Sequence, residues 1–399
     1  MWRLGFFFHE MAFGLLSVFL PLYIVAIGGS LVDVGIMASA ALFFAIPAAF
    51  FWGYVCDKTR RYKRYILLSF LSAAALLYAF TLTSSVSLLI ILYTAMSVLH
   101  VAHEAPKNVL IAELYTREDW EKSYAFYEGF TEAGWLIGLL LGFFSSTFGF
   151  DARSTLLLCG GLNLLGFFVS LILVKDPMLI FERRLVSIEK TVDFAYKGVI
   201  IASKLLDGLL PNEKVGRENL YAFCSGLVLF SLASSTLFTP LPIFFSGDLA
   251  LPASIVFFIY VLNSGGGVIG YFLAVRRSGQ LDEKVRIRRI ILFRSALVFL
   301  LILFVQTVAY TAILTTIVLI LMGFGYALYF VYALSLSMEL IPAGKAGLFN
   351  VLISIGGACG SFLGPFLAQI LGFNYLFLTT GVIFLLAYMT FRVFSWQFA

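Results

Sequence analysis

Long apolar stretches alternate with short polar breaks along the whole chain. Twelve of these stretches are long enough for a helix to cross a bilayer, which takes about 20 residues. The predicted spans are residues 4–27, 33–56, 65–83, 87–111, 121–148, 154–174, 219–245, 252–275, 290–308, 312–338, 346–371 and 373–394. The pattern predicts an all-α integral membrane protein with twelve transmembrane helices.

The longest polar break divides the predicted spans into six and six. Apolar residues recur in this break at helical spacing among basic residues, which is typical of a helix lying on a membrane surface. The sequence therefore predicts an N-terminal six-helix bundle over residues 1–175 and a C-terminal six-helix bundle over 218–399. Residues 176–217 are predicted to form a cytoplasmic linker that carries the amphipathic surface helix.

The two halves repeat each other at an offset of roughly 220 residues. The segment FLPLYI at 19–24 corresponds to FTPLPI at 238–243, and GFD at 149–151 corresponds to GFN at 372–374. Glycines at equal spacing follow the same offset: Gly134, Gly138 and Gly142 in the first half, Gly356, Gly360 and Gly364 in the second. Small residues at every fourth position allow neighbouring helices to approach closely. We therefore expect a duplicated unit whose fifth helices pack through glycine faces.

Composition and charge place the protein in a membrane. Hydrophobic residues make up 61% of the chain and charged residues 12%, against about 25% charged in soluble domains. The basic residues cluster in alternate breaks, which predicts a multi-pass plasma-membrane protein with both termini in the cytoplasm. These short clusters account for the net charge of +5 and do not indicate nucleic-acid binding. The four cysteines occur singly, so neither a thiolate metal site nor a cofactor is expected.

One break, WGYVCDKTRRYKRY at 52–65, places an Asp at the head of a basic run. It is similar to the signature Gly-x-Leu-Ala-Asp-Arg-x-Gly-Arg-Arg of the major facilitator superfamily. The chain resembles this superfamily along essentially its whole length. The matching residues are Gly53, Asp57, Lys58 and Arg61. Arg60 stands where the family has a second Gly. The resemblance implies two pseudo-symmetric bundles and a conformational latch formed by the matching residues. The alternative is that the basic residues only set the topology.

Ionisable residues inside the predicted spans form a further candidate site. A charged side chain within a span costs about 2.5–3.5 kcal/mol, so each one requires an explanation. Four such residues on the fourth span share one helix face, and so do two on the fifth. At a rise of about 1.5 Å per residue, Glu10 on the first span, Lys107 and Glu128 lie at one depth, roughly 9–12 Å from the cytoplasmic ends of their helices. His103, Glu104 and Glu132 lie deeper, at roughly 14–18 Å, near the middle of the membrane. The set comprises Glu10, His100, His103, Glu104, Lys107, Glu128 and Glu132.

This set predicts proton coupling. A carboxylate near the middle of the membrane, next to an imidazole, can take up and release protons near neutral pH. The candidate carrier is Glu104, assisted by His100, His103 and Glu132. The alternative is that Lys107 forms a permanent buried ion pair with the two glutamates of the fifth span.

The family resemblance also implies a central cavity lined by the first, fourth, seventh and tenth spans. Its candidate solute contacts are Thr236 and Thr239 on the seventh span and Tyr326, Tyr329 and Tyr332 on the tenth. His9 or Glu10 and the charged face of the fourth span could also line it. The alternative for His9 is that it extends toward the cytoplasmic surface, as we expect of Arg294.

These features favour a secondary active transporter that works by alternating access and is coupled to protons. The acidic, aromatic cavity favours export of a small amphipathic or cationic organic compound. We expect a monomer whose partners are this solute, protons and membrane lipid.

Two alternatives remain open from the sequence. His100 and His103, with nearby carboxylates, supply ligands that suit a divalent transition metal, so the cargo of the same fold could be such an ion. Lys107 opposes this hypothesis, since it would repel a cation. The second alternative is a non-transporting membrane sensor, although the linker is too short for a soluble output domain. No nucleophile, nucleotide-binding or dinucleotide motif indicates an enzyme.

Overall fold

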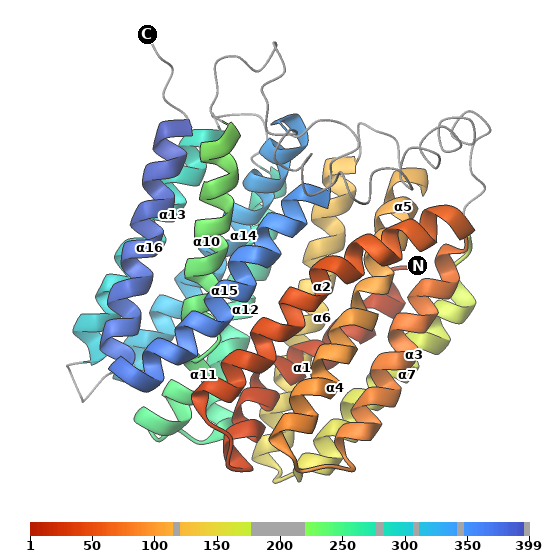
Figure 1. Ribbon diagram of the computed structural model, residues 1–399, viewed down its shortest axis with the longest axis horizontal. Helices are drawn as coiled ribbons and strands as arrows, with labels where there is room; N and C mark the ends of the chain where they lie inside the picture. Colours follow the sequence, from red (N-terminus) through yellow and green to blue (C-terminus); the bar gives the residue numbers. More distant parts are fainter. Residues whose placement is uncertain (115–119, 177–219, 277–282, 306–310, 341–346, 395–399) are drawn as a thin grey trace.

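The computed structural model describes residues 1–114, 120–176, 220–276, 283–305, 311–340 and 347–394, and these are almost entirely helical (Figure 1). Eleven of the described helices are long and apolar enough to cross a membrane. The remaining predicted span, 290–308, falls on a helix whose first turns carry several charged residues. The linker 176–217 lies outside the described residues but for its first residue, so its surface helix stays a prediction.

The first half contains six spanning units. Its elements are α1 Leu4–Ala26, α2 Leu31–Thr59, α3 Tyr62–Phe80, α4 Val86–His100, η1 Val101–His103, α5 Glu104–Leu114, α6 Trp120–Thr147 and α7 Ala152–Leu173. The predicted fourth span is interrupted, since a single 3₁₀ turn, η1, separates α4 from α5. Pro106 explains the change of winding, because a proline lacks an N–H and its ring crowds the carbonyl four residues earlier, that of Ala102.

The second half repeats this arrangement. Its elements are α10 Leu220–Phe238, α11 Leu241–Ile243, η4 Phe244–Asp248, α12 Ala253–Arg276, α13 Glu283–Val305, α14 Thr311–Leu340, α15 Gly347–Leu371 and α16 Phe373–Phe394. The predicted seventh span, 219–245, is broken after Phe238 and ends in a π-helical turn. Pro240 and Pro242 each remove a helical hydrogen bond there, which accounts for the break.

Glycine faces hold equivalent helix pairs together in both halves. A Cβ built at Gly134 would lie 2.7 Å from the carbonyl oxygen of Phe7 on α1, and one at Gly138 would clash with that of Met11. In the second half, Cβ atoms at Gly356 and Gly360 would clash with carbonyl oxygens of α10. The fifth spans of both halves, α6 and α15, thus pack backbone to backbone against the first spans, α1 and α10. This arrangement matches the expectation from the glycine repeat.

The most extensive contacts between the halves are made by two helix pairs, α2 with α15 and α6 with α12. The backbone N–H of Val32 donates to Gln369 Oε1 at 2.9 Å, near the beginning of α2 and the end of α15. The Phe143 and Phe258 rings, with centroids 5.7 Å apart, meet near the end of α6 and the beginning of α12. Both contacts lie at the end of the molecule that the charge pattern predicts to be extracellular.

Candidate functional site

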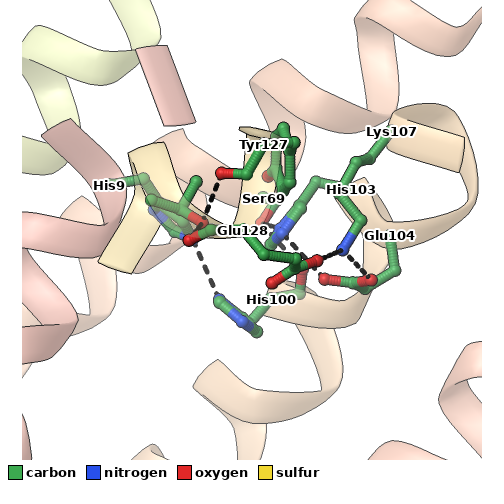
Figure 2. A network of polar contacts seen from close by, with 9 residues as sticks. His9, Ser69, His100, His103, Glu104, Lys107, Tyr127 and Glu128 are labelled. Atoms are coloured by element: carbon green, nitrogen blue, oxygen red, sulfur yellow. Dashed lines mark hydrogen bonds and ion pairs between the residues drawn. The ribbon is translucent and has the colours of Figure 1, made fainter. Parts of the chain in front are cut away.

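The histidines of the chain meet inside the first half. His9 on α1 is fully buried, with its Nε2 2.9 Å from His100 Nδ1 at the end of α4. His103 in η1 presents its ring edge-on to His100, with centroids 4.7 Å apart (Figure 2). Two polar residues of neighbouring helices orient the rings: Asn163 on α7 bonds to His9, and Ser69 on α3 bonds to His103. The alternative that His9 extends to the cytoplasmic surface is therefore wrong.

A chain of charges continues from this cluster toward α6. Glu104 Oε1 lies 3.3 Å from His103 Nε2, and its other oxygen lies 2.6 Å from Lys107 Nζ. Lys107 Nζ is 3.9 Å from Glu128 Oε1 on α6 and 5.2 Å from the centre of the Tyr127 ring. The shortest ion pair of Lys107 is thus with its own helix, while its contact with the fifth span is longer. Figure 2 shows Lys107 beside Glu104, with Glu128 facing the pair.

Two members of the predicted set lie apart from this chain of charges. Glu10 is half-buried and forms no hydrogen bond or ion pair with any residue that the structure describes. Glu132 lies one helical turn beyond Glu128 on α6, and its Oε1 accepts a 2.7 Å hydrogen bond from Ser264 of α12. The predicted ion pair between Lys107 and Glu132 does not form; Glu132 is bonded to the other half of the molecule instead.

A cavity of about 450 Å³ lies between the two halves. Helices α1, α2 and α6 of the first half and α10, α12, α14 and α15 of the second contribute to its wall. Aromatic side chains dominate the wall, among them Trp135, Phe230, Tyr260, Tyr271, Tyr326 and Tyr329. Glu132 is the sole carboxylate among the lining residues in the described part of the chain. The cavity therefore combines aromatic faces with one negative group.

The structure divides the predicted cavity contacts into two groups. Thr239, Tyr326 and Tyr329 line the cavity. Thr236 and Tyr332 lie behind its wall: Thr236 is fully buried, and the Tyr332 hydroxyl accepts a 3.0 Å hydrogen bond from Arg286. The fourth span contributes none of the lining residues, since its charged face points toward α1, α3 and α6.

Arg294 on α13 is completely buried, so the expectation that it reaches the cytoplasmic surface is wrong. Its guanidinium lies 5.0 to 5.5 Å from the centres of the Phe230, Tyr326 and Phe384 rings. It donates long hydrogen bonds of 3.3 Å to Ser234 Oγ and to a backbone carbonyl. Three aromatic faces therefore enclose a cation directly behind the cavity wall.

The residues of the predicted latch lie at the end of α2. Asp57, Lys58 and Arg61 are exposed, and a Cβ built at Gly53 would meet no atom within 4 Å. Arg60 ends the helix in the left-handed conformation, with φ 54°. Glycine adopts this conformation most easily, which gives a physical reason for the Gly that the family signature has here.

Sequence reasoning missed three residues that shape the site. Asn163, Ser69 and Ser264 each place a polar side chain inside an apolar span, and each bonds to an ionisable residue of another helix. A polar residue within a span was the available signal. It did not identify the partners, because these depend on which helices are neighbours.

Comparisons with known proteins agree with this architecture. A sequence profile of the Major Facilitator Superfamily matches residues 4–353. None of the curated proteins compared by sequence matches the chain. Among solved structures, the human organic anion transporter MFSD10 (TETRAN) has a TM-score of 0.66 and 15% identity, over 98% of this chain and 97% of its own.

Two further solved structures are similar in fold. A bacterial homologue of the human lysosomal transporter Spinster, in an inward-facing and occupied conformation, has a TM-score of 0.68 and 14% identity, over 100% of this chain and 97% of its own. A mutant of the nucleoside transporter NupG has a TM-score of 0.63 and 12% identity, over 99% of both chains. Identities this low show the shared fold alone. The chain belongs to the Major Facilitator Superfamily, as a multi-pass membrane transporter with that fold.

Proposed function

We propose that the protein is a secondary active transporter that exchanges protons for a small amphipathic organic cation by alternating access. It acts as a monomer in the plasma membrane, with both termini in the cytoplasm, and exports its solute. The observation that carries this proposal is Glu132, a single carboxylate in an aromatic cavity between the two halves.

The size and lining of the cavity favour such a solute. A volume of about 450 Å³ suits a drug-sized molecule. Aromatic faces attract organic cations, and a carboxylate adds a charge–charge attraction that is strong away from water. Tyr329 lines the cavity, and its hydroxyl has no hydrogen-bond partner in the described part of the chain. That hydroxyl is itself buried, so Tyr329 contributes its ring to the cavity wall.

The position of Arg294 argues against an organic anion as the main solute. A carboxylate solute needs a cation that it can reach, and the described cavity wall offers none. Arg294 is 0% exposed, with aromatic rings between its guanidinium and the cavity. In this conformation Glu132 is the charge presented to a solute.

A row of ionisable groups leads from the cavity into the first half. Glu128 lies one turn from Glu132 on α6, Lys107 lies 3.9 Å from Glu128, and Glu104 lies 2.6 Å from Lys107. Residues four apart on a helix have Cβ atoms about 6 Å apart. We infer that Glu132 is the group for which proton and solute compete, and that Glu104 belongs to the same coupled set.

Contacts at one side of the membrane support alternating access. The bond between Val32 and Gln369 and the Phe143–Phe258 pair close the cavity at the predicted extracellular side. The latch residues Asp57, Lys58 and Arg61 are exposed at the other end of α2. From the contacts at the extracellular side, we infer that the structure represents the state open to the cytoplasm, and we propose that the latch residues stabilise the state in which this side is closed.

Transport in proteoliposomes tests the proposal. With the membrane potential clamped, vesicles made acidic inside should accumulate radiolabelled tetraphenylphosphonium, because outward proton movement drives its entry. Glu132→Gln should abolish the accumulation. Asp151→Asn is the matched control, since it removes an exposed carboxylate but preserves the N-terminal cap of α7. Accumulation that stays coupled to the pH gradient in a Glu104→Gln, Glu132→Gln double variant would refute the proton assignment.

A further inference from the structure

All three histidines of the chain converge on one point. They come from α1, from the end of α4 and from η1, and one ring nitrogen from each of them lies within 4.8 Å of the others. Two of the three side chains, His9 and His103, are buried, and His100 is half-buried. We propose that His9, His100 and His103 form a binding site for a single divalent transition-metal ion such as Zn²⁺, separate from the solute cavity.

The spacing of the nitrogens suits such an ion. Zn²⁺ binds imidazole nitrogen at about 2.0–2.1 Å, so two tetrahedral nitrogen ligands lie about 3.3 Å apart. His9 Nε2 and His100 Nδ1 are 2.9 Å apart, and His103 stands edge-on to both rings. Small rotations of the side chains would therefore admit an ion between nitrogens that already face one another.

The hydrogen bond to Asn163 fixes the tautomer of His9 that metal binding needs. The amide Nδ2 of Asn163 donates to the carbonyl oxygen of Cys159 at 2.9 Å, so the amide oxygen is the atom that faces His9. That oxygen accepts from His9 Nδ1 at 2.5 Å, which leaves His9 Nε2 with its lone pair toward the cluster. Histidine ligands of metals usually donate their second ring nitrogen in this way.

Ser69 has the same effect on His103. Its hydroxyl donates to the carbonyl oxygen of His100 at 3.0 Å, so it accepts from His103 Nδ1 at 3.2 Å. His103 Nε2 then presents its lone pair to Glu104 Oε1, 3.3 Å away. A proton shared between these two atoms, or a cation beside them, would satisfy both. The three imidazoles are therefore the ligands of the proposed site, and Glu104 adds a negative charge beside His103.

The charge around the site does not oppose an ion. Lys107 would repel a cation if it were alone, but it lies 2.6 Å from Glu104 and 3.9 Å from Glu128. With all three groups ionised, this set carries one net negative charge. The repulsion expected from the sequence is therefore offset by the two carboxylates.

The location of the site indicates a bound ion rather than a cargo. None of the three histidines is among the residues that line the cavity. The histidines and their two partners join α1, α3, α4, η1 and α7, all within the first half. An ion here would fix these helices to one another. This inference does not depend on the proposed solute or on proton coupling.

Spectroscopy of the full-length protein tests the site directly. The protein is purified through a tag that contains no histidine and is titrated with Co²⁺, whose visible absorption reports nitrogen ligands in a tetrahedral or five-coordinate site. We expect saturation at one Co²⁺ per chain and displacement by Zn²⁺. His9→Gln, His100→Gln and His103→Gln should each weaken binding at least about tenfold, and Asn163→Ala about 10-fold to 100-fold.

The control is Glu132→Gln, which removes a buried carboxylate of the same half but should leave the Co²⁺ affinity unchanged. If Glu132→Gln loses transport yet keeps the metal, the site and the transport mechanism are independent. If the histidine variants do not fold, the wild-type protein loaded with Cu²⁺ gives the answer, because electron spin-echo modulation counts bound imidazoles. Three are expected. Fewer than three, or a Co²⁺ titration without saturation, would overturn the proposal.

Discussion

Glu132 of α6 accepts a 2.7 Å hydrogen bond from Ser264 of α12, so the carboxylate in the cavity also links the two halves. A solute cation that pairs with Glu132 must compete with this bond or share it. Solute binding at this carboxylate is therefore coupled to the relative movement of the two halves.

Glu132→Gln should weaken binding of tetraphenylphosphonium by about tenfold, which is about 1.4 kcal/mol. The substitution keeps the shape and an oxygen that can accept from Ser264, and removes only the charge. Binding is measured as the ligand-dependent rise of the unfolding midpoint in detergent, since a ligand of the folded state stabilises it by mass action. Tyr329→Phe is the control inside the same cavity, because this probe cannot form hydrogen bonds. An equal loss in both variants would contradict the role of charge.

Gly138→Ala should destabilise the protein by about 1–3 kcal/mol, because the new methyl group would meet the backbone of α1. Gly360→Ala should do the same in the second half, where the carbonyl oxygen of Leu232 lies in the way. The matched control is Gly161→Ala on α7, where a Cβ meets no atom within 4 Å and helix propensity favours Ala. Unfolding midpoints in detergent report all three. A midpoint for Gly138→Ala equal to that of Gly161→Ala would show that the two helices do not pack as described.

Arg60→Gly should stabilise the end of α2 by about 1 kcal/mol relative to Arg60→Ala. Both substitutions remove the arginine side chain, but only glycine adopts φ 54° without strain. The comparison of the two variants isolates the backbone effect from any contact of the side chain. The unfolding midpoints should therefore follow the order Gly above Ala, and the reverse order would exclude a left-handed cap at this position.

In a Val32→Cys, Gln369→Cys double variant, a covalent link between the two introduced thiols should stop transport reversibly. These positions meet where α2 begins and α15 ends, and we infer that they separate when the cavity opens to the outside. The experiment uses a short thiol-specific cross-linker that can be cleaved by reduction, in a background where Cys359, the exposed cysteine, is Ser. Transport should return after reduction. Full transport by the linked protein would show that this contact does not open during the cycle.

Much of the fold follows from the sequence because lipid imposes a simple rule on it. Each span must satisfy its own backbone, so an apolar run of about 20 residues predicts a helix almost unaided. The glycine repeat similarly predicted close packing, which the contacts of Gly138 and Gly360 confirm. The break after Phe238 was missed, because its apolar residues continue through Pro240 and Pro242 without a polar signal.

The candidate site was only partly predictable. Spacing on one helix placed His100, His103 and Glu104 on a common face, but their meeting with His9 depends on the packing of α1 against its neighbours. Glu132 has the same periodicity as Glu128, yet it faces the other half instead of Lys107. Such choices between partners are tertiary, and helical periodicity within one span does not contain them.

Arg294 shows the same limit of prediction from sequence, for a residue that was expected to be exposed. A charged residue near the end of an apolar span usually extends to the membrane surface, which led to the wrong expectation. Here the rings of Phe230, Tyr326 and Phe384 enclose the guanidinium within the protein. These rings come from three other helices, so the sequence around Arg294 gives no sign of them.

Proton movement that depends on the solute tests the central claim most directly. Proteoliposomes that enclose a pH-sensitive dye, with the membrane potential clamped and no initial pH gradient, receive tetraphenylphosphonium outside. The account predicts that the interior becomes more alkaline as the cation enters and protons leave, and that Glu132→Gln abolishes the change. Entry of the cation with no change of internal pH, in the wild-type protein, would contradict proton exchange.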